Sequence, residues 1–222
     1  MKLIPLSGPP AAIDPGVLNG PAVFNTEYRD AHGKITSASY SGWSLGDIFN
    51  KAKITPFSCF NITAADGYFM TVVKENIPGE YYIVTQKDGK EMKPTFIVKD
   101  NADGKLRVVD VESIAEVENF PAGEEISIDL AGIGSAPFMI GHREYKGCDL
   151  VKLMAENGLS GEYIKASSED GYVLIIKRRT YLGSAFVEDG DRRLIGTDLK
   201  LGNWMRKLAS LDDGKKRIVF RR

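Results

Sequence analysis

Apolar and polar residues alternate over short stretches along most of the chain, and this pattern predicts β-strands. Two segments instead carry apolar residues three and four positions apart, which predicts short amphipathic helices. Ser44 and Asp149 stand just before these segments and are good N-cap residues. The apolar faces of the two predicted helices comprise Leu45, Ile48 and Phe49 in the first, and Leu150, Leu153 and Met154 in the second.

Strands are predicted where runs rich in β-branched and aromatic residues are bounded by turn residues. Asp66-Gly67 and Asp170-Gly171 predict tight hairpin turns between two pairs of strands. A third helical stretch is predicted at residues 202–208. The predicted strands are residues 22–28, 59–63, 68–73, 81–86, 95–99, 106–111, 125–130, 163–167, 172–176 and 217–220.

The chain contains an internal repeat. From Gly42 to Asp66 is 24 positions and from Gly147 to Asp170 is 23, so one single-residue gap aligns the two copies over about thirty residues. Each copy has a Tyr-x-Gly-x-x-Leu segment before the predicted helix and an Asp-Gly-Tyr hairpin after it. These segments are Tyr40-Ser41-Gly42-Trp43-Ser44-Leu45 with Ala65-Asp66-Gly67-Tyr68, and Tyr145-Lys146-Gly147-Cys148-Asp149-Leu150 with Glu169-Asp170-Gly171-Tyr172.

The repeat predicts two domains of about 100 residues each. The boundary is placed at the Pro- and Gly-containing stretch 119–123, which gives domains at residues 21–119 and 120–222. The strand at 22–28 is matched to the strand at 125–130 as the first strand of each copy. Residues 1–20 contain four prolines and are predicted to form an extended N-terminal arm.

The repeat unit resembles the molybdopterin-binding domain of sulfite oxidases and related molybdenum oxidoreductases. That family carries a Tyr/Trp-x-Gly-Val-x-Leu segment at the start of a helix, an Ala-Asp-Gly-Tyr hairpin and a later Arg-Leu-Val strand, which Leu106-Arg107-Val108-Val109 matches in the first copy. The resemblance covers about 80 residues of each copy. It implies two tandem sulfite-oxidase-like domains and therefore an α+β fold class, mixed α/β and sheet-rich.

The cysteine positions depart from the family pattern. In the family, a cysteine upstream of the helix supplies the thiolate that binds molybdenum. The corresponding segments here, residues 22–39 and 126–144, contain no cysteine. Cys59 lies downstream, on a predicted strand, and Cys148 stands where the first copy has Trp43. The resemblance therefore implies the fold, and no cofactor is expected; molybdopterin belongs to an alternative hypothesis given below.

Basic residues of the second copy are the main candidates for a ligand site. Lys177, Arg178 and Arg179 follow a predicted strand, and Arg192 and Arg193 follow a later Asp-Gly turn, so a hairpin could bring both runs to one end of the domain. Guanidinium groups suit phosphate or carboxylate. The alternative is a solvated basic edge that discourages strand pairing. The candidate ligand-binding residues are Arg143, Lys177, Arg178, Arg179, Arg192, Arg193 and Cys148.

The cysteines and histidines are weaker candidates for a reactive or metal-binding site than the basic residues are. Cys148 directly precedes Asp149 at a predicted helix start, a location that favours thiol reactivity; the alternative is a small apolar residue in place of Trp43. Cys59 is predicted to be buried and inert. His32 and His142 are predicted in turns or at the surface, and the sequence shows no cluster of metal ligands.

The composition limits the classes of partner that the sequence predicts. The net charge is −1, from 29 Lys and Arg against 30 Asp and Glu, so no nucleic-acid partner is expected. The charge is uneven, with 12 basic and 18 acidic residues up to Ile140 (−6), and 17 basic and 12 acidic from Gly141 (+5). This favours either an anion-binding C-terminal half or surfaces complementary within the chain. No apolar run has the length of a membrane span, and no signal peptide is found, which predicts a cytoplasmic protein unless a leader was trimmed.

Three functions follow as hypotheses. The first is a non-catalytic ligand-binding or accessory protein, whose domains lack the metal-binding cysteine and which binds a small anion or a protein partner. The second is a molybdopterin-dependent oxidoreductase of the sulfite oxidase type, with the metal bound unusually or through Cys148. The third is a protein–protein interaction module whose basic C-terminal half docks on an acidic partner.

Overall fold

A computed structural model describes the protein at residues 1–14, 18, 20–29, 32–101, 106–129, 134–178, 185–188, 191–196, 199 and 203–221. Of the described residues, 55% lie in strands, which form several sheets, and 9% lie in helices, so this part of the protein is mostly β. The predicted α+β class is therefore wrong. The two described helices have 8 and 7 residues, about two turns each, and are too short to form a layer of their own.

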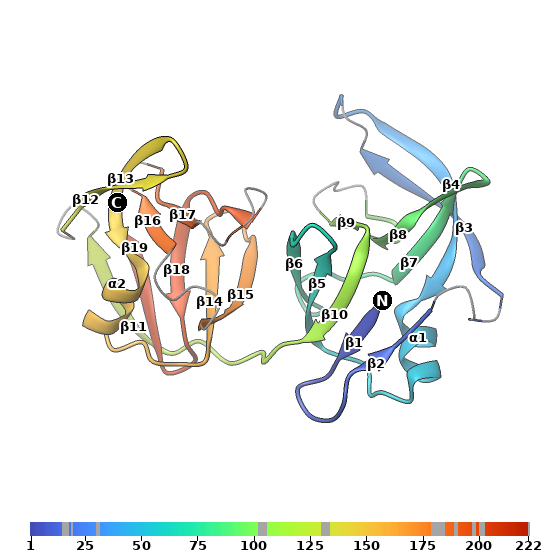
Figure 1. Ribbon diagram of the computed structural model, residues 1–222, viewed down its shortest axis with the longest axis horizontal. Coiled ribbons are helices and arrows are strands. Elements are labelled where there is room, and N and C mark those ends of the chain that lie inside the picture. Colours follow the sequence, from blue (N-terminus) through green and yellow to red (C-terminus); the bar gives the residue numbers. More distant parts are fainter. Residues whose placement is uncertain are drawn as a thin grey trace. The chain divides into compact units, whose positions relative to one another are not determined.

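The chain divides into two compact units, Met1–Asn119 (unit 1) and Phe120–Arg222 (unit 2). Figure 1 draws both ribbons, and each unit is described by itself. Nearly all described strand pairs are antiparallel. The exceptions are β1 with β10 in unit 1 and β11 with β19 in unit 2, so that in each unit the first strand lies parallel to the last.

Unit 1 is built from two five-stranded sheets, ordered β2-β1-β10-β5-β6 and β3-β4-β7-β8-β9. The first residues of the chain, predicted as an extended arm, include the strands β1 and β2 of the first sheet. The elements are β1 Lys2–Ile4, β2 Ala11–Ala12, β3 Ala22–Arg29, β4 Ile35–Ser44, α1 Leu45–Ala52, β5 Cys59–Ala64, β6 Phe69–Val73, β7 Tyr81–Lys87, β8 Lys90–Val98, β9 Arg107–Val109 and β10 Val111–Glu116.

Unit 2 has a five-stranded sheet ordered β11-β19-β18-β14-β15 and a four-stranded sheet ordered β12-β13-β16-β17. Its helix α2 follows β13 directly, as α1 follows β4 (Figure 1). The elements are β11 Glu124–Asp129, β12 Ala136–Ile140, β13 Arg143–Asp149, α2 Leu150–Glu156, β14 Tyr163–Ser168, β15 Val173–Lys177, β16 Ala185–Glu188, β17 Arg193–Gly196, β18 Leu208–Asp212 and β19 Lys216–Arg221.

The sequence repeat has a counterpart in the strand pairing. In both units a hairpin leads into the helix, a second hairpin follows, and two further strands extend the sheet of the first hairpin: β3-β4-α1-β5-β6-β7-β8 corresponds to β12-β13-α2-β14-β15-β16-β17. The strand at 22–28 therefore corresponds to β12, because both begin the hairpin before the helix. Its predicted match to the strand at 125–130 is wrong, since β11 pairs with β19 in the other sheet.

Both predicted helix starts are confirmed. The Ser44 side chain accepts a hydrogen bond from the backbone N–H of Asp47, and the Asp149 side chain accepts one from the N–H of Lys152. The predicted apolar faces of both helices are buried. The predicted helix at 202–208 is wrong over its described residues, because Met205 forms an isolated bridge with Leu194 and Leu208 begins β18.

The main core of unit 1 lies between its two sheets and α1, and includes Phe49, Phe60 and Phe96, all fully buried. A second, smaller cluster covers the other face of the sheet that contains β4 and β8. It is formed by Ala38, Tyr40, Val84 and Ile97, with Phe24, Tyr28, Tyr82 and Met92 partly buried against it. The second sheet of unit 1 therefore has apolar groups on both faces.

Candidate functional site

The basic residues predicted as a ligand site have different surroundings. Arg192 is 9% exposed, and its guanidinium forms an ion pair with Glu169 and donates to the carbonyl oxygen of Phe220 over 3.4 Å. The backbone carbonyl of Arg192 accepts from the N–H of Leu208. Arg192 thus links the β14–β15 turn, β18 and β19, and its charge serves the fold of unit 2.

Lys177 and Arg178 lie at the end of β15, at the edge of the five-stranded sheet of unit 2. The Lys177 ammonium forms an ion pair with Glu162 at 3.0 Å and lies 5.7 Å from the ring centre of Tyr163. Arg178 is half-buried and lines a small cavity beneath α2. Arg179 lies outside the described residues.

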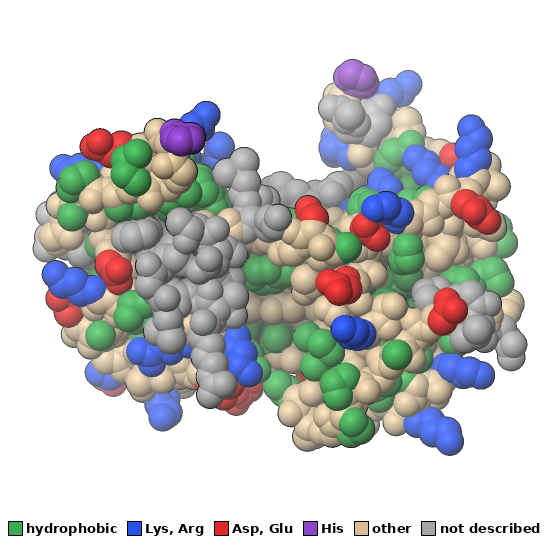
Figure 2. Space-filling model, in the orientation of Figure 1, with side chains coloured by type: hydrophobic (Ala, Val, Ile, Leu, Met, Phe, Trp, Pro, Cys, Tyr) green, Lys and Arg blue, Asp and Glu red, His purple; other side chains and the backbone are tan. Residues whose placement is uncertain are grey.

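Arg193 begins β17, in the other sheet of unit 2. Its guanidinium carbon lies 5.9 Å from the ring centre of Tyr145, whose ring also packs against Phe138 and Trp204. Arg143 is exposed at the start of β13. On the face drawn in Figure 2, the coloured Lys and Arg side chains are spread over each unit and do not gather into one patch. That these residues share one ligand stays a prediction.

Replacing Arg192 by Gln is expected to lower the free energy of unfolding by about 2 kcal/mol, because it removes the buried cation that pairs with the Glu169 carboxylate. This loss of stability is smaller than for a fully buried ion pair because the Glu169 side chain is 33% exposed. Arg206→Gln, which removes an exposed guanidinium of the same unit, is expected to change the free energy of unfolding by less than about 1 kcal/mol. Urea denaturation of both variants measures the difference. Equal effects of the two substitutions would contradict the structural role of Arg192.

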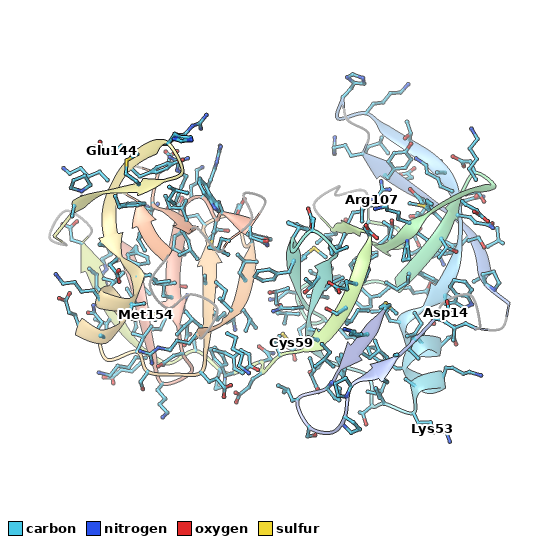
Figure 3. The ribbon with its side chains drawn as sticks, in the orientation of Figure 1. Asp14, Lys53, Cys59, Arg107, Glu144 and Met154 are labelled. Carbon is cyan, nitrogen blue, oxygen red and sulfur yellow. The ribbon has the colours of Figure 1, made fainter. Side chains whose placement is uncertain are left out.

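Both cysteines lie in strands and are buried. Cys59 is fully buried in β5, and Cys148 is 8% exposed near the end of β13, one residue before the N-cap of α2 (Figure 3 labels Cys59). Neither lines the two cavities of unit 1 described below. Among the described residues, no three His, Cys, Asp or Glu side chains form a group that could hold a metal ion. Both thiols are therefore packed inside their units.

A groove in unit 1 is a better candidate for a ligand site than the predicted basic residues, because charged, hydroxyl-bearing and aromatic side chains line it together. It lies where β4 ends and α1 begins, next to the start of β7, and has a volume of about 380 Å³. This volume falls in the range of small-molecule sites. We call it the α1 groove; the residues that line it include Ser44, Gly46, Asp47, Phe49, Lys74, Glu80, Tyr81 and Tyr82.

The local sequence explains how the rim of the α1 groove forms. β4 runs directly into α1 because Ser44 caps the helix: its hydroxyl accepts from the N–H of Asp47 at 3.0 Å and donates to the Asp47 carboxylate at 2.7 Å. Gly46 adds no side chain to the first turn. The Asp47 carboxylate sits at the positive end of the helix dipole, which stabilises its charge. The groove therefore has one fixed acidic group at this end.

Lys74 supplies the positive charge of the α1 groove. It directly follows the apolar strand β6, and its ammonium lies 5.9 Å from the ring centre of Tyr81. Burial lowers the pKa of Lys74 below its ordinary value. Among the described residues, no carboxylate forms an ion pair with it. Lys74 is thus a partly desolvated cation with its charge available to a ligand.

The other titratable groups of the α1 groove are held in place by their neighbours. The Lys99 ammonium, 3.0 Å from the Glu80 carboxylate, lowers the pKa of Glu80. Burial raises the pKa of Tyr81, whose hydroxyl donates to the carbonyl oxygen of Ile77. The hydroxyl of Tyr82 donates to Glu80 at 3.1 Å. Glu80 and Tyr82 therefore already have partners, whereas Lys74 has no partner of opposite charge in the part of the chain that the structure describes.

Sequence reasoning missed the α1 groove and favoured the basic half of the chain. The pairing of β4 with β7 brings residues 44–47 and 80–82 together, and Lys74 joins them from the end of β6 in the other sheet of unit 1. One sequence signal was present: Lys74 stands immediately after an apolar run, at a point where the next side chain is close to the core.

Comparisons with known proteins add no assignment. No protein-family model matches the chain, and no curated protein matches it. Neither described helix has the length and apolar character needed to cross a membrane.

Proposed function

We propose that this chain is a non-catalytic ligand-binding protein built from two related domains, and that the α1 groove holds a small anionic molecule. The observation that carries the proposal is the Lys74 ammonium, partly desolvated and without an acidic partner in the described chain. A buried cation gains stability when an anion replaces its lost hydration. The family resemblance stays a prediction, and the missing upstream cysteine supports a role without molybdenum.

The lining of the α1 groove suggests the shape of the ligand. The rings of Phe49 and Tyr81 offer apolar contacts, and Lys74 offers the charge. Asp47 can accept a hydrogen bond from a ligand donor. A flat molecule that carries a carboxylate at one end and a polar group at the other fits this arrangement of groups.

Benzoate is a suitable first probe, with benzamide as its neutral counterpart. Benzoate is expected to shift the backbone amide resonances of Gly46 and Asp47 in two-dimensional NMR spectra, and benzamide to bind at least tenfold more weakly. Lys74→Gln is expected to weaken benzoate binding at least tenfold, whereas Lys51→Gln, which removes an exposed charge from the last turn of α1, leaves it unchanged. Binding is expected to weaken at alkaline pH as Lys74 loses its proton, below the pH at which an ordinary lysine does.

Two results would overturn this proposal. Equal affinity of the Lys74→Gln variant and the unmodified protein for benzoate would remove Lys74 from the site. Molybdenum or tungsten in stoichiometric amount, with pterin fluorescence after oxidation of freshly purified protein, would instead favour the oxidoreductase hypothesis. The experiment then moves to Cys→Ser variants at Cys59 and Cys148.

A further inference from the structure

A second cavity of unit 1 contains an arginine with an unsatisfied buried donor. The cavity has a volume of about 100 Å³, and Arg107, Thr26, Tyr28, Tyr40, Ile97 and Asn101 contribute to its lining. It shares no lining residue with the α1 groove. We call it the Arg107 cavity; Figure 3 labels Arg107 beside the short strand β9.

The strand register explains why Arg107 faces an apolar surface. Arg107 pairs with Ile97 of β8, and the next residue, Val108, pairs with Phe96. Because side chains alternate along a strand, Val108 enters the main core while Arg107 lies on the opposite face of the sheet, with Ile97. That face carries the smaller cluster that contains Tyr40 and Ile97. The stem of Arg107 is therefore placed against apolar groups.

Within the described residues, the guanidinium of Arg107 has no acidic partner to account for this placement. Its Nε atom is buried and has no hydrogen-bond partner, and no described carboxylate forms an ion pair with the side chain. Buried polar groups in folded proteins are nearly always hydrogen-bonded, and an exception indicates a water or ion that completes the site. A charged donor needs such a partner more than a neutral one does.

The surroundings of the Arg107 cavity favour an anion over water alone. The Lys87 ammonium lies 3.8 Å from the ring centre of Tyr28, which adds positive charge beside the cavity. The Thr26 hydroxyl accepts from the N–H of Asp100 at 2.8 Å, so its own proton remains to be donated. Glu27 also lines the cavity, but it is exposed, and strand alternation directs its side chain away from the face of Thr26 and Tyr28.

We propose that the Arg107 cavity binds a small oxyanion, to which the Arg107 guanidinium donates through Nε. Planar guanidinium groups bind phosphate, sulfate and carboxylate with paired hydrogen bonds. The volume is about that of three water molecules in the liquid, too small for most whole ligands and sufficient for one anionic group. The site is separate from the α1 groove and does not depend on the function proposed for it.

The direct test follows the Nε–H resonance of Arg107, assigned by its loss in Arg107→Lys. Sodium phosphate, sulfate and acetate are titrated in turn at constant ionic strength, balanced with sodium chloride. Phosphate or sulfate is expected to move this resonance saturably and to raise the melting temperature of the protein. If acetate alone does so, the occupant is the carboxylate of a larger molecule. No movement with any of the three at tens of millimolar would overturn the proposal.

Variants separate binding from folding. Arg107→Met keeps the apolar stem and removes the charge, so it is expected to be at least as stable as the unmodified protein without added oxyanion. It is also expected to lose the rise in melting temperature and to bind phosphate at least tenfold more weakly. Arg206→Met removes an exposed arginine of unit 2 and serves as the matched control, with binding unchanged. Equal phosphate binding by Arg107→Met and the unmodified protein would contradict the site, and Lys74→Gln is expected to leave it intact.

Discussion

Replacing Gly42 by Ala is expected to lower the free energy of unfolding of unit 1 by about 3 kcal/mol or more. A Cβ atom at this position would lie 2.2 Å from the carbonyl oxygen of Ile83 and 2.6 Å from Cα of Val84. Both neighbours are backbone atoms of β7, a central strand in which Ile83 and Val84 are fully buried, so they cannot move aside as a flexible side chain can. The substitution therefore has to separate β4 from β7.

The pairing of these strands explains why the glycine is needed. The register between β4 and β7 shifts at Ser41 and Gly42, where Ser41 pairs with Gln86 and Gly42 with Val84. At this bulge, just before α1 begins, the backbone of β7 leaves no room for a Cβ atom on Gly42. Gly42 is also the glycine of the Tyr-x-Gly-x-x-Leu segment, so the repeat motif has a steric reason in unit 1.

Gly46→Ala is the matched control for Gly42→Ala. It is the same substitution four residues later, inside α1, where the nearest atom to the new Cβ would be Ser44 Oγ at 3.6 Å. It is expected to stabilise unit 1 by up to about 1 kcal/mol, because alanine favours the helix over glycine. Trp43 reports on unit 1 by fluorescence when Trp204 is replaced by Phe. In thermal melts, Gly42→Ala is expected to lower the Trp43 transition by about 10 °C or more; an unchanged transition would contradict the close approach of β7.

Local features of the fold could be predicted from the sequence because each depends on a few neighbouring residues. The helices followed from apolar spacing and from Ser44 and Asp149 as caps, and the hairpins from Asp66-Gly67 and Asp170-Gly171. The fold class, in contrast, was predicted wrongly. The helical segments were easy to recognise, but each ends after about two turns, and every described element between them is a strand.

Features that depend on contacts between distant parts of the chain could not be predicted from the sequence. The strand predicted at 125–130 is β11. Apolar alternation does not specify sheet order, so it could not show whether this strand lies in the sheet of β12 or in that of β19. The same holds for the candidate sites. Arg192 was predicted to bind a ligand, but its guanidinium pairs with Glu169, which lies in another turn. Conversely, nothing in the sequence indicated that Lys74 and Arg107 would lie without an acidic partner among the residues that the structure describes.

Asp213 illustrates a long-range structural role that its sequence context did not reveal. It belongs to an Asp-Asp-Gly turn between β18 and β19 and is 8% exposed. One carboxylate oxygen accepts from the N–H groups of Ser160 and Gly161 at 2.6 and 2.9 Å, and the other from those of Lys215 and Lys216 at 3.0 and 2.8 Å. The side chain therefore connects this turn to the segment that follows α2.

Replacing Asp213 by Asn is expected to lower the free energy of unfolding at pH 7 by about 3 kcal/mol. Asparagine retains one acceptor oxygen, but its NH₂ group would face two N–H donors that are then left without an acceptor. Urea denaturation followed by circular dichroism measures the change. Asp191→Asn, which removes an exposed carboxylate of the same unit, is the control and is expected to have little effect.

The pH dependence of this loss tests its electrostatic origin. Burial by itself raises the pKa of Asp213, but the four N–H donors outweigh it, so that pKa lies below the ordinary value of 3.8. A carboxyl whose pKa is lowered by folding stabilises the folded state above its unfolded pKa, and this contribution is lost as the pH falls through the folded value. The stability difference between the unmodified protein and Asp213→Asn is therefore expected to stay constant from neutral pH to about pH 5 and to shrink below about pH 4. A difference that stayed constant down to the acid limit would show that shape, and not the charge of Asp213, holds the turn.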